Sequence, residues 1–155
     1  QATERLVREL GRQLGHHGNR LGEFVQEMVE PAVVELLNTR GISVHQVSPR
    51  WRAYDDQRRP FLEIDLLVTN TEVMVAIECK SKLSREDIDE HQERLAEFRR
   101  AFPRYASLKL LGGVAAMVLP ADAARYAERQ GFFVFGPNGE NMEIRNPAEF
   151  VPQEW

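Results

Sequence analysis

The sequence predicts one α/β domain in which helices flank a mixed β-sheet. Residues 63–80 contain two apolar, β-branched runs joined by a short polar connection, which is typical of a β-hairpin. Residues 84–102 have the apolar spacing of an amphipathic helix. Residues 108–135 alternate strand, helix and strand, and the strands of such a βαβ unit are parallel with a right-handed crossover. A chain of 155 residues suits one domain with a substantial core.

The N-terminal segment is predicted to be a separate helix. Leu6, Leu10 and Leu14 recur at helical spacing and form a narrow apolar stripe. A stripe this narrow suits a coiled coil or a partner helix as well as the domain's own core. We therefore divide the chain into an N-terminal helix, residues 1–18, as a coiled-coil or dimerisation segment, and a main domain, residues 19–155. Because the stripe needs apolar cover, we expect a homodimer.

The main domain is predicted to begin with a helix from Asn19 to Arg40. Gly41 would stop this helix, and Pro31 would kink it or divide it into two pieces. Glu23 lies beside the apolar stripe in the first turn. It is either a functional carboxylate or a solvated helix charge.

A short strand, residues 42–47, and an arginine-rich loop, residues 48–60, are expected next. Arginine forks contact phosphates, and aromatic rings, which Trp51 and Tyr54 supply here, can stack on bases. A charged surface loop explains the composition almost as well, but this segment leads directly into the strand that bears Asp65. The nucleic-acid-binding candidates in it are Arg50, Arg52, Arg58 and Arg59.

The register of the hairpin decides which side chains share a face of the sheet. With the turn centred on Asn70 and Thr71, one face would carry Asp65, Glu78 and Lys80, with Glu63 as a rim charge. Asp65 and Glu78 would be diagonal neighbours, about 7–8 Å apart, so that their carboxylates could converge on one ion. The other face would be apolar, with Leu62, Ile64, Leu66 and Val68 opposite Cys79, Ile77, Val75 and Val73.

Asp65, Glu78 and Lys80 are the residue types of a metal-dependent catalytic site. Oxygen ligands alone suit a hard cation such as Mg²⁺, for which Mn²⁺ could substitute. Lys80 could orient or deprotonate a metal-activated water, or neutralise charge that builds on a phosphate. Arginine, which supplies 17 of the 20 basic residues, cannot give up a proton, so a lysine at this position is informative. The alternative is an ordinary exposed strand face, with Glu78 and Lys80 solvated and Asp65 paired to an arginine.

The elements after the hairpin complete the expected sheet. Ser84 to Asp87 is a capping-box variant that would start a helix ending before Pro103. Gln92 lies where one turn of that helix lacks an apolar residue. The remaining elements are a strand buried on both faces (108–119), a helix closed by Gly131 (121–130), a second buried strand (132–135) and an edge strand (141–145).

This arrangement resembles the PD-(D/E)XK nuclease superfamily. The resemblance lies in Asp65, a connection of 12 residues, and then Glu78-Cys79-Lys80 at the end of an apolar strand. It covers roughly residues 19–136 and implies a restriction-endonuclease-like αβββαβ core with a mixed central sheet flanked by helices. The sequence departs from the superfamily's pattern at Ile64, where the superfamily's name has proline.

The resemblance also implies roles for individual residues. The two acids and the backbone carbonyl of Cys79 would bind Mg²⁺, and Lys80 would assist the water. Glu23 matches by position a glutamate that completes the metal site in many relatives. Gln92 matches a glutamine that approaches the active site in some branches, although a polar residue that bridges backbone groups is the alternative.

Charge and composition limit the function classes. A formal net charge of −4 speaks against a simple electrostatic nucleic-acid binder, although a bound metal adds positive charge where the acids are densest. The sequence shows neither a membrane span nor a signal peptide, so a cytoplasmic location is expected. The single cysteine, Cys79, excludes an intrachain disulfide.

Two hypotheses follow. The leading one is a Mg²⁺-dependent DNA endonuclease that hydrolyses phosphodiester bonds with a metal-activated water, which the complete set of Asp65, Glu78 and Lys80 favours. The alternative is a non-catalytic nucleic-acid-binding or oligomerisation module on the same fold, which the acidic net charge favours.

Overall fold

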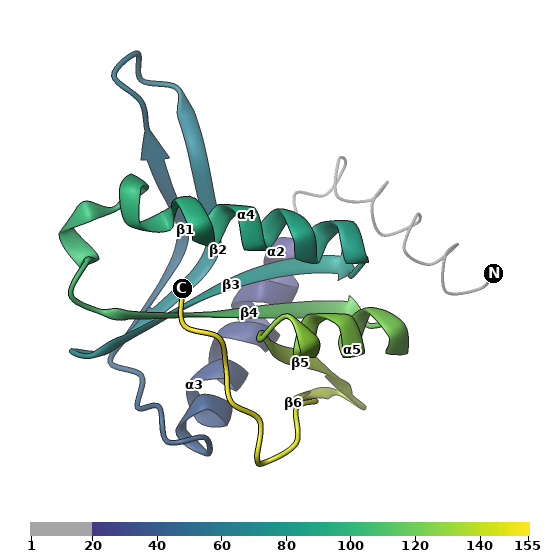
Figure 1. The fold of residues 1–155 in the computed structure, drawn as a ribbon. Helices are drawn as coiled ribbons and strands as arrows, with labels where there is room; N and C mark the ends of the chain where they lie inside the picture. Colours follow the sequence, from purple (N-terminus) through teal and green to yellow (C-terminus); the bar gives the residue numbers. More distant parts are fainter. Residues whose placement is uncertain (1–19) are drawn as a thin grey trace.

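The computed structural model describes residues 20–155, which form a six-stranded sheet with helices on both faces (Figure 1). The predicted helix with Leu6, Leu10 and Leu14, and the division between residues 18 and 19, lie outside these residues. In chain order the elements are α2 (Arg20–Phe24), a π-helical segment (Val25–Val29), α3 (Glu30–Asn38), β1 (Gln46–Tyr54), β2 (Pro60–Thr69), β3 (Val73–Lys82), α4 (Arg85–Ala101), a 3₁₀ turn (Pro103–Tyr105), β4 (Lys109–Val118), α5 (Ala121–Arg129), β5 (Phe133–Asn138) and β6 (Asn141–Ile144).

The sheet is mixed, as the sequence predicted. Its strands lie in the order β1 to β6. Antiparallel pairing joins β1 to β2, β2 to β3 and β5 to β6, whereas β3, β4 and β5 run parallel. Helices α4 and α5 make the two crossovers between the parallel strands. The αβββαβ order is therefore confirmed.

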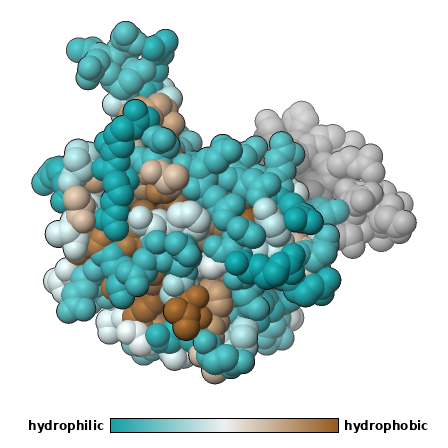
Figure 2. All heavy atoms as spheres, in the orientation of Figure 1, coloured by the Kyte–Doolittle hydropathy of each residue, from teal (hydrophilic) through white to brown (hydrophobic). Residues whose placement is uncertain are grey.

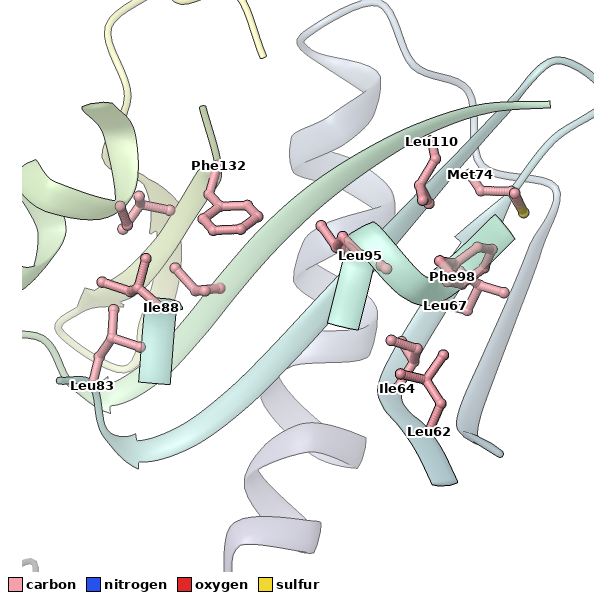
Figure 3. Close-up of a cluster of buried hydrophobic side chains, with 14 of the residues drawn as sticks. Leu62, Ile64, Leu67, Met74, Leu83, Ile88, Leu95, Phe98, Leu110 and Phe132 are labelled. Carbon is pink, nitrogen blue, oxygen red and sulfur yellow. The ribbon is translucent and has the colours of Figure 1, made fainter. Parts of the chain in front are cut away.

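Each face of the sheet has its own hydrophobic core. On one face, α4 buries Ile88, Leu95 and Phe98 against the strands, and α5 adds its alanines (Figure 3). On the other face, the helix that contains α2 and α3 buries Phe24, Val29, Val33 and Leu37. Strand β4 is buried on both sides because it lies between the two layers, which confirms the prediction from its apolar run.

The first helix contains a π-helical segment immediately before Pro31. Pro31 has no N–H to donate, and the N–H of Glu30 bonds to the carbonyl of Val25, five residues earlier. The helix is therefore not broken at Pro31, as the sequence suggested, but widened into a π-helical turn just before it. Such π-turns are frequent at functional sites, and this one lies beside a cavity described below. Gly41 follows the helix with φ of +80°, which glycine adopts without strain.

The prediction of a loop over residues 48–60 is wrong for most of its length. Residues 46–54 form the edge strand β1, and the predicted strand at residues 42–47 is formed only at its end. Trp51 packs edge-on against Phe102 and Tyr105, with ring centroids 5.5 and 5.2 Å away. An exposed edge strand tolerates a proline and several arginines. Because these residues are also typical of loops, the sequence pattern did not indicate a strand. The end of the β1–β2 hairpin projects from the body of the protein, and its surface is hydrophilic (Figures 1 and 2).

The predicted register between β2 and β3 is wrong by two residues. Leu66 lies opposite Ile77 rather than Val75, because the turn is centred on Thr71 and Glu72. The cause is the side chain of Asn70, whose Oδ1 accepts hydrogen bonds from the N–H groups of Glu72 and Val73 at 2.7 and 2.8 Å.

A shift by an even number of residues preserves most of the predicted faces. Leu66, Val68, Ile77 and Cys79 share the core under α3, as expected. The prediction fails for Leu62 and Ile64, which lie in the core under α4 together with Leu67. Strand β2 thus changes face at Asp65, where Arg50 of the neighbouring strand has φ of +54°.

The chain after β6 is irregular but packed against the domain. The side chain of Asn146 is buried and bridges the N–H of Val134 and the carbonyl of Phe132. Trp155 stacks on the ring of Phe132 at a centroid distance of 5.6 Å. In the described part of the chain, every helix is too short or too polar to cross a bilayer.

Candidate active site

Strands β2 and β3 part at Asp65. Their pairing runs from Thr69 opposite Met74 to Leu66 opposite Ile77 and stops there. Beyond that point the side chain of Asp65 replaces the strand pairing: its Oδ2 accepts a hydrogen bond of 2.9 Å from the N–H of Cys79. Asp65 is thereby fixed in the opening between the two strands.

Glu78 lies directly next to this opening, on the face that α4 covers. Its side chain is only 7% exposed, and its Oε2 accepts two hydrogen bonds from Arg94, at 3.0 Å from Nη1 and 2.8 Å from Nη2. Asp65 and Glu78 line the same groove. Burial, together with the hydrogen bond and charge of Asp65, raises the pKa of Glu78 to about 8, although Arg94 and Lys80 act in the opposite direction. In the metal-free protein at neutral pH, Glu78 is therefore mostly protonated.

Lys80 projects from the same face as Glu78. Its Nζ lies 3.7 Å from Oε2 of Glu78 and 3.6 Å from Oδ1 of Asp87. Asp87 is the third residue of α4, and with Ser84 it forms the predicted capping box, which is confirmed. The start of α4 thus holds the lysine beside the acids.

Glu23 lies on the opposite face of the sheet from Glu78. It lines a cavity of about 500 Å³ under the π-helical segment, together with Glu30, Arg50, Asp65 and Cys79. Glu78 instead lines a groove of about 390 Å³ on the α4 face, together with Asp65 and Arg94. Asp65 alone reaches both spaces, so the structure does not bring Glu23 together with the acid pair.

The remaining nucleic-acid-binding candidates are dispersed along the β1–β2 hairpin. Arg52 pairs with Glu63 at 3.2 Å and Arg59 with Asp55 at 3.1 Å, and both pairs are exposed. Arg58 lies in the turn at the end of the hairpin with φ of +65°. Only Arg50 lines a cavity with Asp65.

Gln92 does not join the site, and Arg94 takes the place expected for it. The amide of Gln92 donates to Oε1 of Gln130, the residue that follows helix α5, at 2.7 Å. Residues two positions apart on a helix point about 200° apart, so Gln92 and Arg94 cannot face the same neighbour. Sequence reasoning missed Arg94, whose signal was its position beside the apolar stripe, three residues after the buried His91.

The acid pair fits a hard divalent cation. Mg²⁺ needs only one or two protein carboxylates, because it keeps several waters. The pKa of Glu78 is raised mainly by burial and further by the neighbouring Asp65 carboxyl, and a bound cation would favour the charged form of both acids. Within residues 20–155 no three His, Cys, Asp or Glu side chains converge on one metal position, so further protein ligands would have to come from backbone carbonyls or from movement of Glu23.

Comparisons with known proteins gave a distant structural likeness. The small subunit (R.BspD6I2) of the heterodimeric restriction endonuclease R.BspD6I is similar to this chain, with 16% sequence identity, coverage of 74% of this chain and 69% of the other, and a TM-score of 0.34. No protein-family model and no curated protein matches the sequence. Because the identity and the TM-score are both low, the assignment of function depends on the chain's own residues.

Glu78 should make the metal-free protein less stable as the pH rises from about 6.5 to about 8. Because its folded pKa of about 8 lies above its ordinary value of 4.5, the folded state holds a proton that the unfolded state has lost. The free energy of unfolding should therefore fall, by at most about 1.4 kcal/mol per pH unit. Buried His91 acts outside this window, because its pKa is lowered to about 4 and its contribution is lost only as the pH falls below 6.5.

The measurement is denaturant unfolding in EDTA across this pH window for the wild type and Glu78→Gln. The glutamine variant should show no such fall in stability. Equal pH dependence in the two proteins would contradict the assigned pKa.

Proposed function

We propose that this protein is a Mg²⁺-dependent nuclease that hydrolyses phosphodiester bonds. The observation that supports this most is the convergence of Asp65, Glu78 and Lys80 where β2 and β3 part, beside an open groove. A buried acid with a second carboxyl beside it is costly to a fold, and acids whose pKa is shifted in this way are concentrated at functional sites.

Each residue of the site would have its own role in the reaction. Asp65 and Glu78 would hold the cation, which supplies an activated water and neutralises charge on the phosphate when bound. Lys80 is placed to orient that water or to stabilise the leaving oxygen, because it lies beside Glu78 and is held by Asp87. The groove next to Glu78 gives a phosphate access to the site from the α4 face.

DNA is the substrate that we propose. The second strand of the β1–β2 hairpin lines part of the groove, and the end of the hairpin projects from the body of the protein (Figure 1). The hairpin carries Arg50, Arg52, Arg58 and Arg59, and two-stranded ribbons fit the major groove of a duplex. Exposed Tyr54 and Phe61, near the end of the same hairpin, offer rings for contact with bases. A cytoplasmic location remains a prediction from the sequence.

A specific observation favours the non-catalytic alternative. Both amino groups of the Arg94 guanidinium donate to the same carboxylate oxygen of Glu78. A buried acid paired permanently to an arginine would be a structural ion pair. The protein would then be a nucleic-acid-binding or oligomerisation module on this fold.

Cleavage of supercoiled plasmid, and of flap and junction substrates, in Mg²⁺ or Mn²⁺ tests the nuclease. Lys80→Ala should slow cleavage by about 10²–10⁴-fold, the usual effect of losing a group that assists proton transfer, while metal binding remains. Lys109→Ala is the matched control, because this lysine pairs with Glu154 at the surface and should leave cleavage unchanged.

Asp65→Asn separates metal binding from folding. Asparagine can still accept the hydrogen bond from Cys79 N–H, so the metal-free protein should be as stable as the wild type or more stable, since a repelling charge is gone. The variant should lose both cleavage and stabilisation by Mg²⁺. In the wild type, free Mg²⁺ at a hundred times its dissociation constant should raise the free energy of unfolding by about 2.7 kcal/mol. If the wild type cuts nothing and melts identically with and without metal, the non-catalytic module is correct.

We also propose that the protein is a homodimer through Leu6, Leu10 and Leu14, since two active sites suit the cutting of both strands of a duplex. Sedimentation of the full chain should give a dimer, and deletion of residues 1–14 should weaken it. A full chain that stays monomeric at high concentration would exclude this assembly.

A further inference from the structure

Arg94 is bonded to one carboxylate oxygen of Glu78. Its two amino groups both donate to Oε2, at 3.0 and 2.8 Å, and Lys80 Nζ lies 3.7 Å from the same oxygen. Metal binding at this oxygen therefore requires the guanidinium to leave.

Arg94 has a second position available. It extends from α4 along the groove of about 390 Å³ and is 21% exposed, whereas Glu78 is 7% exposed. Glu90, one helical turn earlier and half exposed, already lies 4.0 Å from Nη2 and can support the guanidinium as it turns outward. Phe61 and Leu62 form an apolar side of the same groove, and Glu63 and Asp65 add two carboxylates to its lining.

We propose that Arg94 stands in for the metal and then binds the substrate. In the metal-free protein its guanidinium is hydrogen-bonded to Glu78. When a divalent cation takes Glu78, Arg94 turns into the groove and binds a phosphate of the nucleic-acid strand there, because the guanidinium fork matches phosphate as well as carboxylate. This inference rests on the proposed function and deepens it by adding a substrate-binding residue.

The exchange couples metal binding to strand binding. A cation frees the guanidinium for a phosphate, and a phosphate that binds the guanidinium frees Glu78 for a cation. Each ligand must then raise the affinity for the other by the same factor. A structural ion pair between Arg94 and Glu78 would produce no such coupling.

The test measures Ca²⁺ affinity by calorimetry and the affinity for a short fluorescent DNA duplex, with Ca²⁺ and with EDTA, at one fixed salt concentration. Removal of the competitor in Arg94→Ala should tighten Ca²⁺ binding by about tenfold, which corresponds to about 1.4 kcal/mol. The same variant should bind duplex more weakly in Ca²⁺, and Ca²⁺ should no longer increase its duplex affinity.

Two further variants keep the result interpretable. Arg125→Ala removes the same charge from the exposed surface of α5 and should leave both Ca²⁺ affinity and the coupling unchanged. Arg94→Gln keeps a hydrogen-bond donor at Glu78 and replaces the alanine variant if that variant does not fold. It should tighten Ca²⁺ binding and weaken duplex binding as Arg94→Ala does, but by a smaller factor.

The outcomes separate this inference from the nuclease proposal. Ca²⁺ binding that is unchanged or weaker in Arg94→Ala and Arg94→Gln overturns the exchange, even if the wild type cuts DNA. A wild type that binds no Ca²⁺, with variants that bind none, overturns it as well. Tighter Ca²⁺ binding and lost coupling support it even in a protein that cuts none of the substrates tested.

Discussion

The hydrogen bond from Cys79 N–H to the Asp65 carboxylate is the interaction on which the site depends. Each backbone donor inside a sheet needs an acceptor, and two strands can part only if those donors find other partners. Asp65 meets this need at the first unpaired position of β3, so the strands can part without leaving that N–H unbonded. Beyond it, β2 continues along β1 and β3 along β4. The opening that results is where the acids and the lysine meet.

The charges around this opening explain why it suits a cation. Glu78 is almost completely buried and has two basic neighbours, yet its pKa is raised to about 8, because burial and the second carboxyl outweigh Arg94 and Lys80. A folded protein gains little stability from such an arrangement, since a buried ion pair barely offsets the cost of its own desolvation. The acids are held together by β3, by the bond from Cys79 and by α4, and a divalent cation would turn their repulsion into attraction for a shared ion.

Much of the fold could be predicted from the sequence, because the strands and helices that form the core carry clear periodic patterns. The αβββαβ order, the buried strand β4 and the capping box at Ser84 all have local signals. Strand β1 had a weaker signal, because an edge strand exposes polar side chains and tolerates Pro49. The hairpin register depended on one side chain, Asn70, whose bonds to the backbone moved the turn by one residue.

The candidate site was predictable only in part. The grouping of Glu78 with Lys80 follows from strand alternation, which a register shift of two residues does not alter. Arg94 could not be chosen over Gln92 from the sequence, because the choice depends on how α4 is rotated against the sheet. Glu23 could not be placed either, because Asp65 is open to both faces of the sheet, and Glu23 and Glu78 approach it from opposite sides.

A crystal structure with Mn²⁺, located by its anomalous scattering, would show whether Asp65 and Glu78 hold a metal. We expect one strong anomalous peak in the opening between β2 and β3, bonded to a carboxylate oxygen of Asp65 and one of Glu78, with Arg94 turned away from Glu78. A peak located elsewhere, or no peak while both amino groups of Arg94 remain on Glu78, would contradict it.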